Sequence, residues 1–244
     1  DAGRFDHLVI ESSGISEPMP VAVTFDLSDE FGRALSDVAE LDTMVTVVDA
    51  ARFTDDFNST DLLADRDQDT GPGDERTLVD LLVDQIEFAN VILVNKTDLV
   101  SEKRVAFLTD VLRTLNPDAT ILPTQHSRVE LDRIVGTSAF DFEAAQSMPG
   151  WMKELEGEHV PETEEYGIAS FTYRARRPFH PQRFWDFVQS NWPGVIRAKG
   201  FFWLATRSAV VGELSQAGRL RDQQPAGYWW AAMPDDYWPD DPHQ

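Results

Sequence analysis

Short apolar runs alternate with helical patterns through the first half of the chain. Val, Ile and Leu predominate in four runs, as is typical of strands that are buried on both faces of a parallel sheet. These runs are residues 5–10, 44–48, 91–94 and 120–122. Strands that alternate with helices through short loops indicate an α/β domain with a mostly parallel sheet.

The segments between the later runs have the spacing of amphipathic helices. Apolar residues recur on one helical face of residues 78–89, with acidic residues opposite, and again in residues 105–115. Asn116 and Pro117 end the second helix, because the residue before a proline disfavours helical backbone. Residues 55–75 show no periodicity and predict a long, mobile surface insertion.

The pattern changes beyond residue 141. The acidic sequence EGEHVPETEE indicates a linker, after which residues 168–173 alternate like a strand and Pro181 opens a helix. Further aromatic strands are expected at residues 195–199, 201–206, 209–214 and 227–232. The predicted domains are therefore residues 1–145, a linker at 146–166, and a small α+β domain with an aromatic core at 167–244.

The net charge of the chain limits which molecules it can bind. The formal charge is −22, from 43 acidic and 21 basic residues, and a field of that sign repels phosphate backbones. Only four of the basic residues are lysines, which suggests adaptation to high salt in the host. No apolar run is long enough to span a membrane, no signal peptide is visible and cysteine is absent. We therefore expect a cytoplasmic protein that binds neither nucleic acid nor membranes.

The most specific motif follows the strand at 91–94. Asp98 can accept two hydrogen bonds, from guanine N1–H and the exocyclic amine, which adenine does not offer. The Asn95 amide can contact N7 and tie neighbouring loops together, while the Lys96 stem can pack over the base. This Asn-Lys-x-Asp pattern predicts guanine recognition, and the alternative is an ordinary strand-end loop with polar caps.

A second motif follows the first predicted strand. Glu11 at its end is placed to hold Mg²⁺ beside nucleotide phosphates, and Gly14 lets a backbone N–H approach a γ-phosphate. The phosphate-loop pattern Gly-x-x-x-x-Gly-Lys-Ser/Thr does not occur in the chain. Either the chain is no nucleotide hydrolase, or its phosphate loop lies upstream of Asp1, as the abrupt strand start favours.

Together these motifs resemble the CobW-like P-loop GTPases, a family associated with cobalamin biosynthesis and with delivery of zinc or other metals. The resemblance rests on Glu11-Ser12-Ser13-Gly14 with Pro18, on Val47-Val48-Asp49-Ala50, on Asn95-Lys96-Thr97-Asp98, and on the segments at 177–181, 192–194 and 199–203. It implies a partial P-loop GTPase domain followed by a CobW-type C-terminal domain. It also implies a phosphate loop and a Cys-x-Cys-Cys metal motif in an N-terminal part outside the chain.

The resemblance further implies functional roles. Glu11 and Gly14 would couple Mg²⁺ and the γ-phosphate to catalysis, and Asn95, Lys96 and Asp98 would bind GTP. The intact protein would be a GTPase that delivers zinc or cobalt to a client metalloprotein.

Two alternatives stay open at this point. His126 follows the last strand of the first domain, where related proteins have a candidate metal ligand, but a surface-loop imidazole is the simpler interpretation. For the whole chain, the alternative is a non-hydrolysing interaction module whose C-terminal domain binds a client protein.

Overall fold

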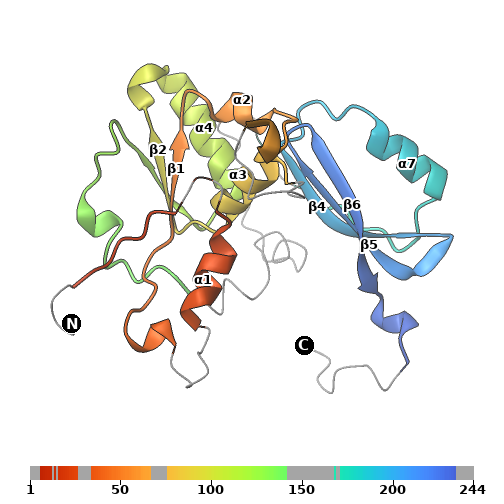
Figure 1. Ribbon diagram of the computed structural model, residues 1–244. Coiled ribbons are helices and arrows are strands. Elements are labelled where there is room, and N and C mark those ends of the chain that lie inside the picture. The colour runs from red at the N-terminus through yellow and green to blue at the C-terminus, as the bar shows by residue number, and fades with distance from the viewer. Residues whose placement is uncertain are drawn as a thin grey trace. The chain divides into compact units, whose positions relative to one another are not determined.

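The computed structural model describes residues 6–12, 14, 16–26, 34–66, 76–141, 168 and 171–234. The chain forms two compact units, Asp1–Phe171 and Thr172–Gln244 (Figure 1). The first contains a parallel sheet and the second an antiparallel sheet. The predicted fold class, an α/β domain followed by a small α+β domain, is therefore confirmed. Within the described ranges, no helix has the length and apolar character needed to cross a bilayer.

Three parallel strands form the sheet of the first unit. They are β1 (Val45–Asp49), β2 (Val91–Asn95) and β3 (Thr120–Pro123), with β2 in the middle. Three of the predicted strands are thus confirmed. Helix α3 (Leu78–Glu87) connects β1 to β2, and helix α4 (Glu102–Leu115) connects β2 to β3, as the alternating pattern predicts. Residues 91–94 are all buried, which explains why β2 is apolar throughout.

Side-chain caps set the ends of the two helices. The hydroxyl of Thr77 accepts the Asp80 N–H at the start of α3, and Ser101 caps α4 in the same way. The buried Asn116 amide follows α4 and donates to the carbonyls of Ile86 and Ala89 at 2.7 and 2.9 Å. One side chain therefore satisfies carbonyls left open at the C-terminus of α3 and joins the ends of the two helices.

The insertion before α3 is more ordered than its sequence suggests. Its described part contains helix α2 (Phe53–Phe57) and a 3₁₀ turn at Leu63–Arg66. Phe53 and Phe57 are buried and stack at a centroid distance of 5.4 Å, and Leu63 is fully buried against α3. The insertion expected at residues 55–75 thus has regular structure in part of residues 55–66, because Phe57 and Leu63 are buried, and two apolar residues at this spacing carry no periodic signal. Residues 67–75 lie outside the described residues.

The strand expected at residues 5–10 does not form in its described part. Residues 7–10 have no regular secondary structure, and Leu8, Val9 and Ile10 are 74%, 80% and 58% exposed. A strand requires a hydrogen-bonding neighbour, and β1 pairs only with β2 among the described residues. The run is apolar as expected, but no strand within the described ranges pairs with it. Before the first sheet residue, the described chain instead contains helix α1 (Pro18–Asp26).

The second unit packs one helix with a three-stranded antiparallel meander. Helix α7 (Pro181–Gln189) precedes β4 (Arg197–Leu204), β5 (Arg207–Ala217) and β6 (Leu220–Tyr228). The strands expected at 195–199 and 201–206 are one strand. Strand β6 is polar and contains Pro225, which an edge strand tolerates, so the prediction located only its end. Residues 171–173 form no strand, contrary to expectation.

Aromatic rings form the interior of this unit. Phe179, Phe184 and Phe202 pack in series, with ring centroids 5.0 and 4.3 Å apart. Phe202 on β4 lies opposite Gly212 on β5, where a Cβ atom would come within 2.4 Å of the ring. Glycine at position 212 therefore makes room for the ring. The expected aromatic core is confirmed.

Candidate functional site

Polar side chains gather where the parallel strands end. Asp49 and Asn95 are partners in register at the carboxyl ends of β1 and β2, and Val94 is the partner of Pro123 on β3. Because parallel strands end at the same edge of a sheet, the loops that follow them meet there. In open α/β sheets this edge is where ligands bind.

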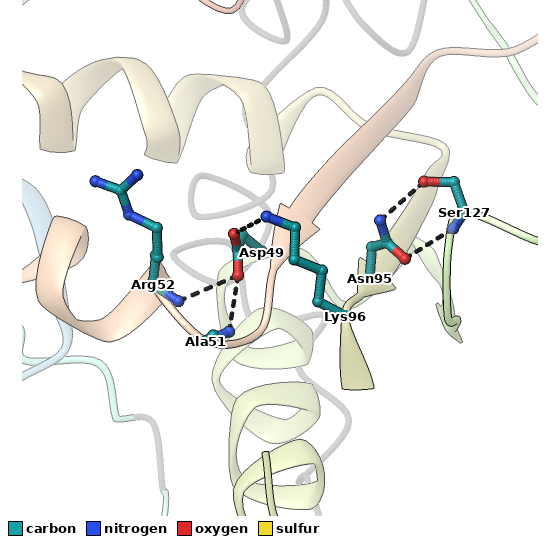
Figure 2. A network of polar contacts seen from close by, with 6 residues as sticks. All are labelled: Asp49, Ala51, Arg52, Asn95, Lys96 and Ser127. Carbon is teal, nitrogen blue, oxygen red and sulfur yellow. Dashed lines mark hydrogen bonds and ion pairs between the residues drawn. The ribbon is translucent and has the colours of Figure 1, made fainter. Parts of the chain in front are cut away.

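Asn95 locks the loop after β3 to the end of β2 (Figure 2). Its Nδ2 donates to the Ser127 hydroxyl at 2.8 Å, and its Oδ1 accepts the Ser127 N–H at 2.8 Å. The Thr124 hydroxyl also donates to Oδ1, at 3.3 Å. The loop-tying role proposed for Asn95 has its geometry here, whereas Ser127 and Thr124 were missed by sequence reasoning. In the sequence, these two residues are marked only by their place in the polar run that directly follows β3.

The backbone around this lock is unusual. Lys96, His126 and Ser127 have φ angles of 62°, 54° and 52°, in the left-handed region that residues with a side chain rarely adopt. Each such residue costs about 1–2 kcal/mol relative to right-handed backbone. Left-handed residues of this kind tend to persist where surrounding contacts hold them, and they cluster at binding sites.

Lys96 points from the end of β2 toward β1. Its Nζ donates to Asp49 Oδ2 at 2.6 Å, while Asp49 Oδ1 accepts the N–H groups of Ala51 and Arg52 (Figure 2). Burial raises the pKa of the Asp49 carboxyl, but these hydrogen bonds and the lysine charge outweigh burial and leave the pKa below its ordinary value. The lysine stem is therefore held across the sheet edge instead of extending freely into solvent.

Asp98 occupies a fixed turn but has a free carboxylate. It lies in the 3₁₀ turn Thr97–Leu99, which is tied to the neighbouring loop because the Thr97 N–H and hydroxyl both donate to the Thr124 carbonyl. The Asp98 side chain is exposed and has no partner among the described residues. A carboxylate with both oxygens open can accept the two donors of a guanine base.

Glu11 and Gly14 lie in an exposed segment that α3 holds from one side. Gln85 Nε2 donates to the carbonyls of Gly14 and Ser16 at 2.9 and 3.2 Å. The carboxylate of Glu17 pairs with Arg76 at 2.7 Å, just before α3. These contacts fix the loop after Glu11, and Gln85 was not anticipated from the sequence. The roles predicted for Glu11 and Gly14 stay predictions.

His126 is an exposed loop residue beside Ser127. In the part of the chain that the structure describes, no group of three or more His, Cys, Asp or Glu side chains is placed to hold a metal ion. A zinc site of protein ligands needs three or four of them. Metal binding by His126 stays a prediction.

The contact between Lys96 and Asp49 gives a direct pH prediction. The lowered pKa means that the contact stabilises the fold above about pH 3.9, the unfolded value, and is lost as the pH falls through the folded pKa. Substitution Lys96→Met should raise the pKa of Asp49, because burial is then opposed mainly by two backbone N–H groups. Carboxyl-carbon NMR titration measures this pKa directly.

Asp42 is the internal control for that titration. Its pKa is also below the ordinary value, chiefly because the Thr43 hydroxyl and the Ser138 N–H donate to it, and Lys96 takes no part. The pKa of Asp42 should therefore be unchanged in Lys96→Met. Equal pKa values of Asp49 in the parent and in Lys96→Met would show that the contact between Lys96 and Asp49 does not form in solution.

The parallel sheet with its connecting helices and this polar edge place the first unit in the α/β class of domains, which bind ligands at such an edge. Residues 1–123 match the family of CobW/HypB/UreG nucleotide-binding domains, and residues 168–244 match the cobalamin synthesis protein CobW C-terminal domain. The chain belongs to the CobW family. The resemblance seen in the motifs is thereby confirmed.

Curated relatives agree with this assignment. The chain is 47% identical over 234 residues to zinc-regulated GTPase metalloprotein activator 1 of Dictyostelium discoideum, covering 94% of this chain and 49% of that protein. It is 36% identical over 102 residues to the zinc chaperone CobW of Sinorhizobium sp, covering 40% of this chain and 27% of that protein. The chain thus spans about half the length, or less, of these relatives.

A solved structure is also similar. The Zn(II)-bound YjiA GTPase from E. coli matches with 20% identity and a TM-score of 0.40, covering 95% of this chain and 64% of that one.

Proposed function

We propose that the chain is the base-recognising part of a GTP-dependent zinc metallochaperone. The observation that carries the proposal is the assembly at the end of β2, where Asn95 is locked to Ser127, Lys96 is held by Asp49 and Asp98 is left open. Asp98 accepts the guanine donors, Asn95 holds the loop after β3 in place, and the Lys96 stem covers one face of the base.

Two residues are assigned to the nucleotide phosphates and their magnesium ion. Glu11 is an exposed carboxylate with no described protein partner, which suits Mg²⁺ because this ion is held by one or two carboxylates together with waters and phosphates. Gly14 presents a backbone N–H in a loop whose carbonyls Gln85 fixes. Hydrolysis would also need a phosphate loop, and the pattern Gly-x-x-x-x-Gly-Lys-Ser/Thr does not occur in this sequence. When bound, Mg²⁺ would neutralise charge on the phosphates, while the residues of this chain position the base.

Zinc rather than cobalt is the proposed cargo, because two relatives are named for zinc. Nucleotide turnover would release the metal to a client metalloprotein in the cytoplasm. Neither nucleic acid nor a membrane has a place in this scheme, in keeping with the charge of −22.

Calorimetry on the 244-residue chain tests whether this chain binds the guanine base but not the phosphates. Because base contacts remain and the phosphate cradle does not, GTP should bind no tighter than about 100 µM. Guanosine and GTP should bind with similar affinity, since phosphates add little, whereas adenosine and ATP should not bind measurably. Low-micromolar binding of GTP would reveal a phosphate site within the chain, and equal binding of adenosine would contradict guanine recognition.

A further inference from the structure

Positive charge is concentrated in one segment of this acidic protein. Arg174, Arg176, Arg177 and Arg183 lie within the stretch 171–185, which contains no Asp or Glu. Of the chain's 43 acidic and 21 basic residues, all 43 acids but only 17 bases lie outside this stretch. All four side chains are exposed, and none has a carboxylate partner among the described residues. Exposed arginines without partners, in a chain so rich in acids, leave their charge available to another molecule.

Three of these arginines, Arg176, Arg177 and Arg183, border a cleft in the second unit. The cleft has a volume of about 650 Å³, and its polar lining is Arg176, Arg177, His180 and Arg183. The His180 Nδ1 accepts the Arg183 N–H at the start of α7, so in the neutral ring the Nε2 carries the proton and can donate to an anion. The arginines and His180 together offer only donors to a ligand. We call this feature the arginine cleft.

The remaining walls of the arginine cleft are apolar and firmly held. Tyr173 stacks on Phe179 at 6.4 Å, and Phe179 packs on Phe184 at 5.0 Å, so the rings continue into the interior of the unit. The Phe179 N–H donates to the Trp203 carbonyl, and its own carbonyl accepts the Ala205 N–H. The segment between Tyr173 and α7 is therefore fixed to the end of β4 by its backbone.

We propose that the arginine cleft binds an acidic segment of a partner protein, in which carboxylates alternate with apolar side chains. Guanidinium groups bind carboxylates bidentately, and the rings of Tyr173 and Phe179 offer apolar surface between the charges. A cleft of this volume holds several side chains, more than one inorganic anion requires. A nucleic acid is disfavoured because the net charge of −22 repels its phosphate backbone.

Fluorescence polarisation with labelled peptides tests the proposal. A peptide of repeated Glu-Glu-Phe should bind the 244-residue chain, and repeated Lys-Lys-Phe should not. The double variant Arg176→Glu with Arg183→Glu should weaken binding about tenfold or more, because desolvated charge pairs are converted to repulsions. Repeated Glu-Glu-Ser should bind more weakly than Glu-Glu-Phe, because it cannot use the rings. Both arginines are exposed and unpaired, so the variant should keep the fold of the parent.

The matched control carries the same change in net charge outside the cleft. Arg133→Glu with Arg219→Glu alters two exposed arginines, of which Arg219 lies in the turn between β5 and β6, at the opposite end of β5 from the residues that hold Phe179. This variant should retain binding. Equal losses in both variants, or no loss in the cleft variant, would overturn the proposal. So would tighter, cleft-dependent binding of a labelled oligothymidylate, which would assign the cleft to nucleic acid.

Discussion

Substitution of Asp98 by asparagine should change the base preference of the protein from guanine to xanthine. In the proposed function the Asp98 carboxylate accepts the N1–H and exocyclic N–H of guanine, whereas xanthine carries a carbonyl in place of the exocyclic amine. Asparagine can donate to that carbonyl and still accept from N1–H. Because Asp98 has no protein partner among the described residues and is held by a turn tied to Thr124, the substitution should leave the turn intact.

The expected change is large. Hydrogen-bonding sites reject a ligand with a missing or mismatched group by factors of roughly ten thousand, so a reversal of about a thousandfold in the ratio of the two affinities is a modest expectation. Competition of a fluorescent GTP analogue by GTP, xanthosine triphosphate and ATP, carried out on the full-length protein, measures the ratio. Asp98→Ala should lose preference for GTP without gaining any for xanthosine triphosphate.

Asp118→Asn is the matched control for that experiment. Asp118 is exposed and precedes β3, so it lies at the edge of the sheet opposite the strand ends that carry Asn95 and Asp49. This variant should keep the parent's selectivity. An Asp98→Asn protein with unchanged selectivity would remove Asp98 from base recognition and with it the main support for the proposed function.

Substitution Gly212→Ala should destabilise the second unit strongly. The added Cβ would lie 2.4 Å from the Phe202 ring, which is already packed on Phe184 with the ring centroids 4.3 Å apart, so both rings would have to shift. Overpacking of this kind costs about 1–3 kcal/mol, equivalent to several degrees in the melting temperature of a small domain. Thermal unfolding followed by aromatic circular dichroism reports on this unit.

Gly200→Ala provides the comparison on the paired strand. Gly200 lies on β4 with no atom near the position of an added Cβ, so the variant should melt at or slightly above the temperature of the parent. The double variant Gly212→Ala with Phe202→Leu should recover part of the loss, because the smaller side chain makes room. Equal melting temperatures for the two alanine variants would show that Phe202 does not lie over Gly212 in solution.

Strands with many local apolar residues were predictable, and strands that depend on a distant neighbour were not. β1, β2 and β3 are short runs of Val, Ile and Leu, and each was located to within a residue or so at either end. The run at 7–10 is equally apolar, yet it pairs with no strand among the described residues. Strand β6 is the opposite case, because its sequence is polar. It forms a strand because β5 supplies its hydrogen bonds.

The same distinction applies to the candidate site. Asn95, Lys96 and Asp98 are adjacent in the sequence and directly follow a strand, so their spacing identified them. Ser127 meets Asn95 across 32 positions, and Gln85 meets Gly14 across 71. Contacts over such distances arise from the packing of the sheet and its helices, which residue spacing alone does not encode.

The left-handed backbone at Lys96, His126 and Ser127 has a consequence for binding kinetics. The Asn95 lock holds these conformations through hydrogen bonds within the protein itself. Under the proposed function, a base that arrives at this edge meets a loop that is already held in place, and the entropic cost of association is correspondingly small. Guanine nucleotides and their analogues should then associate at similar rates, and the difference in their affinities should appear in how long each remains bound.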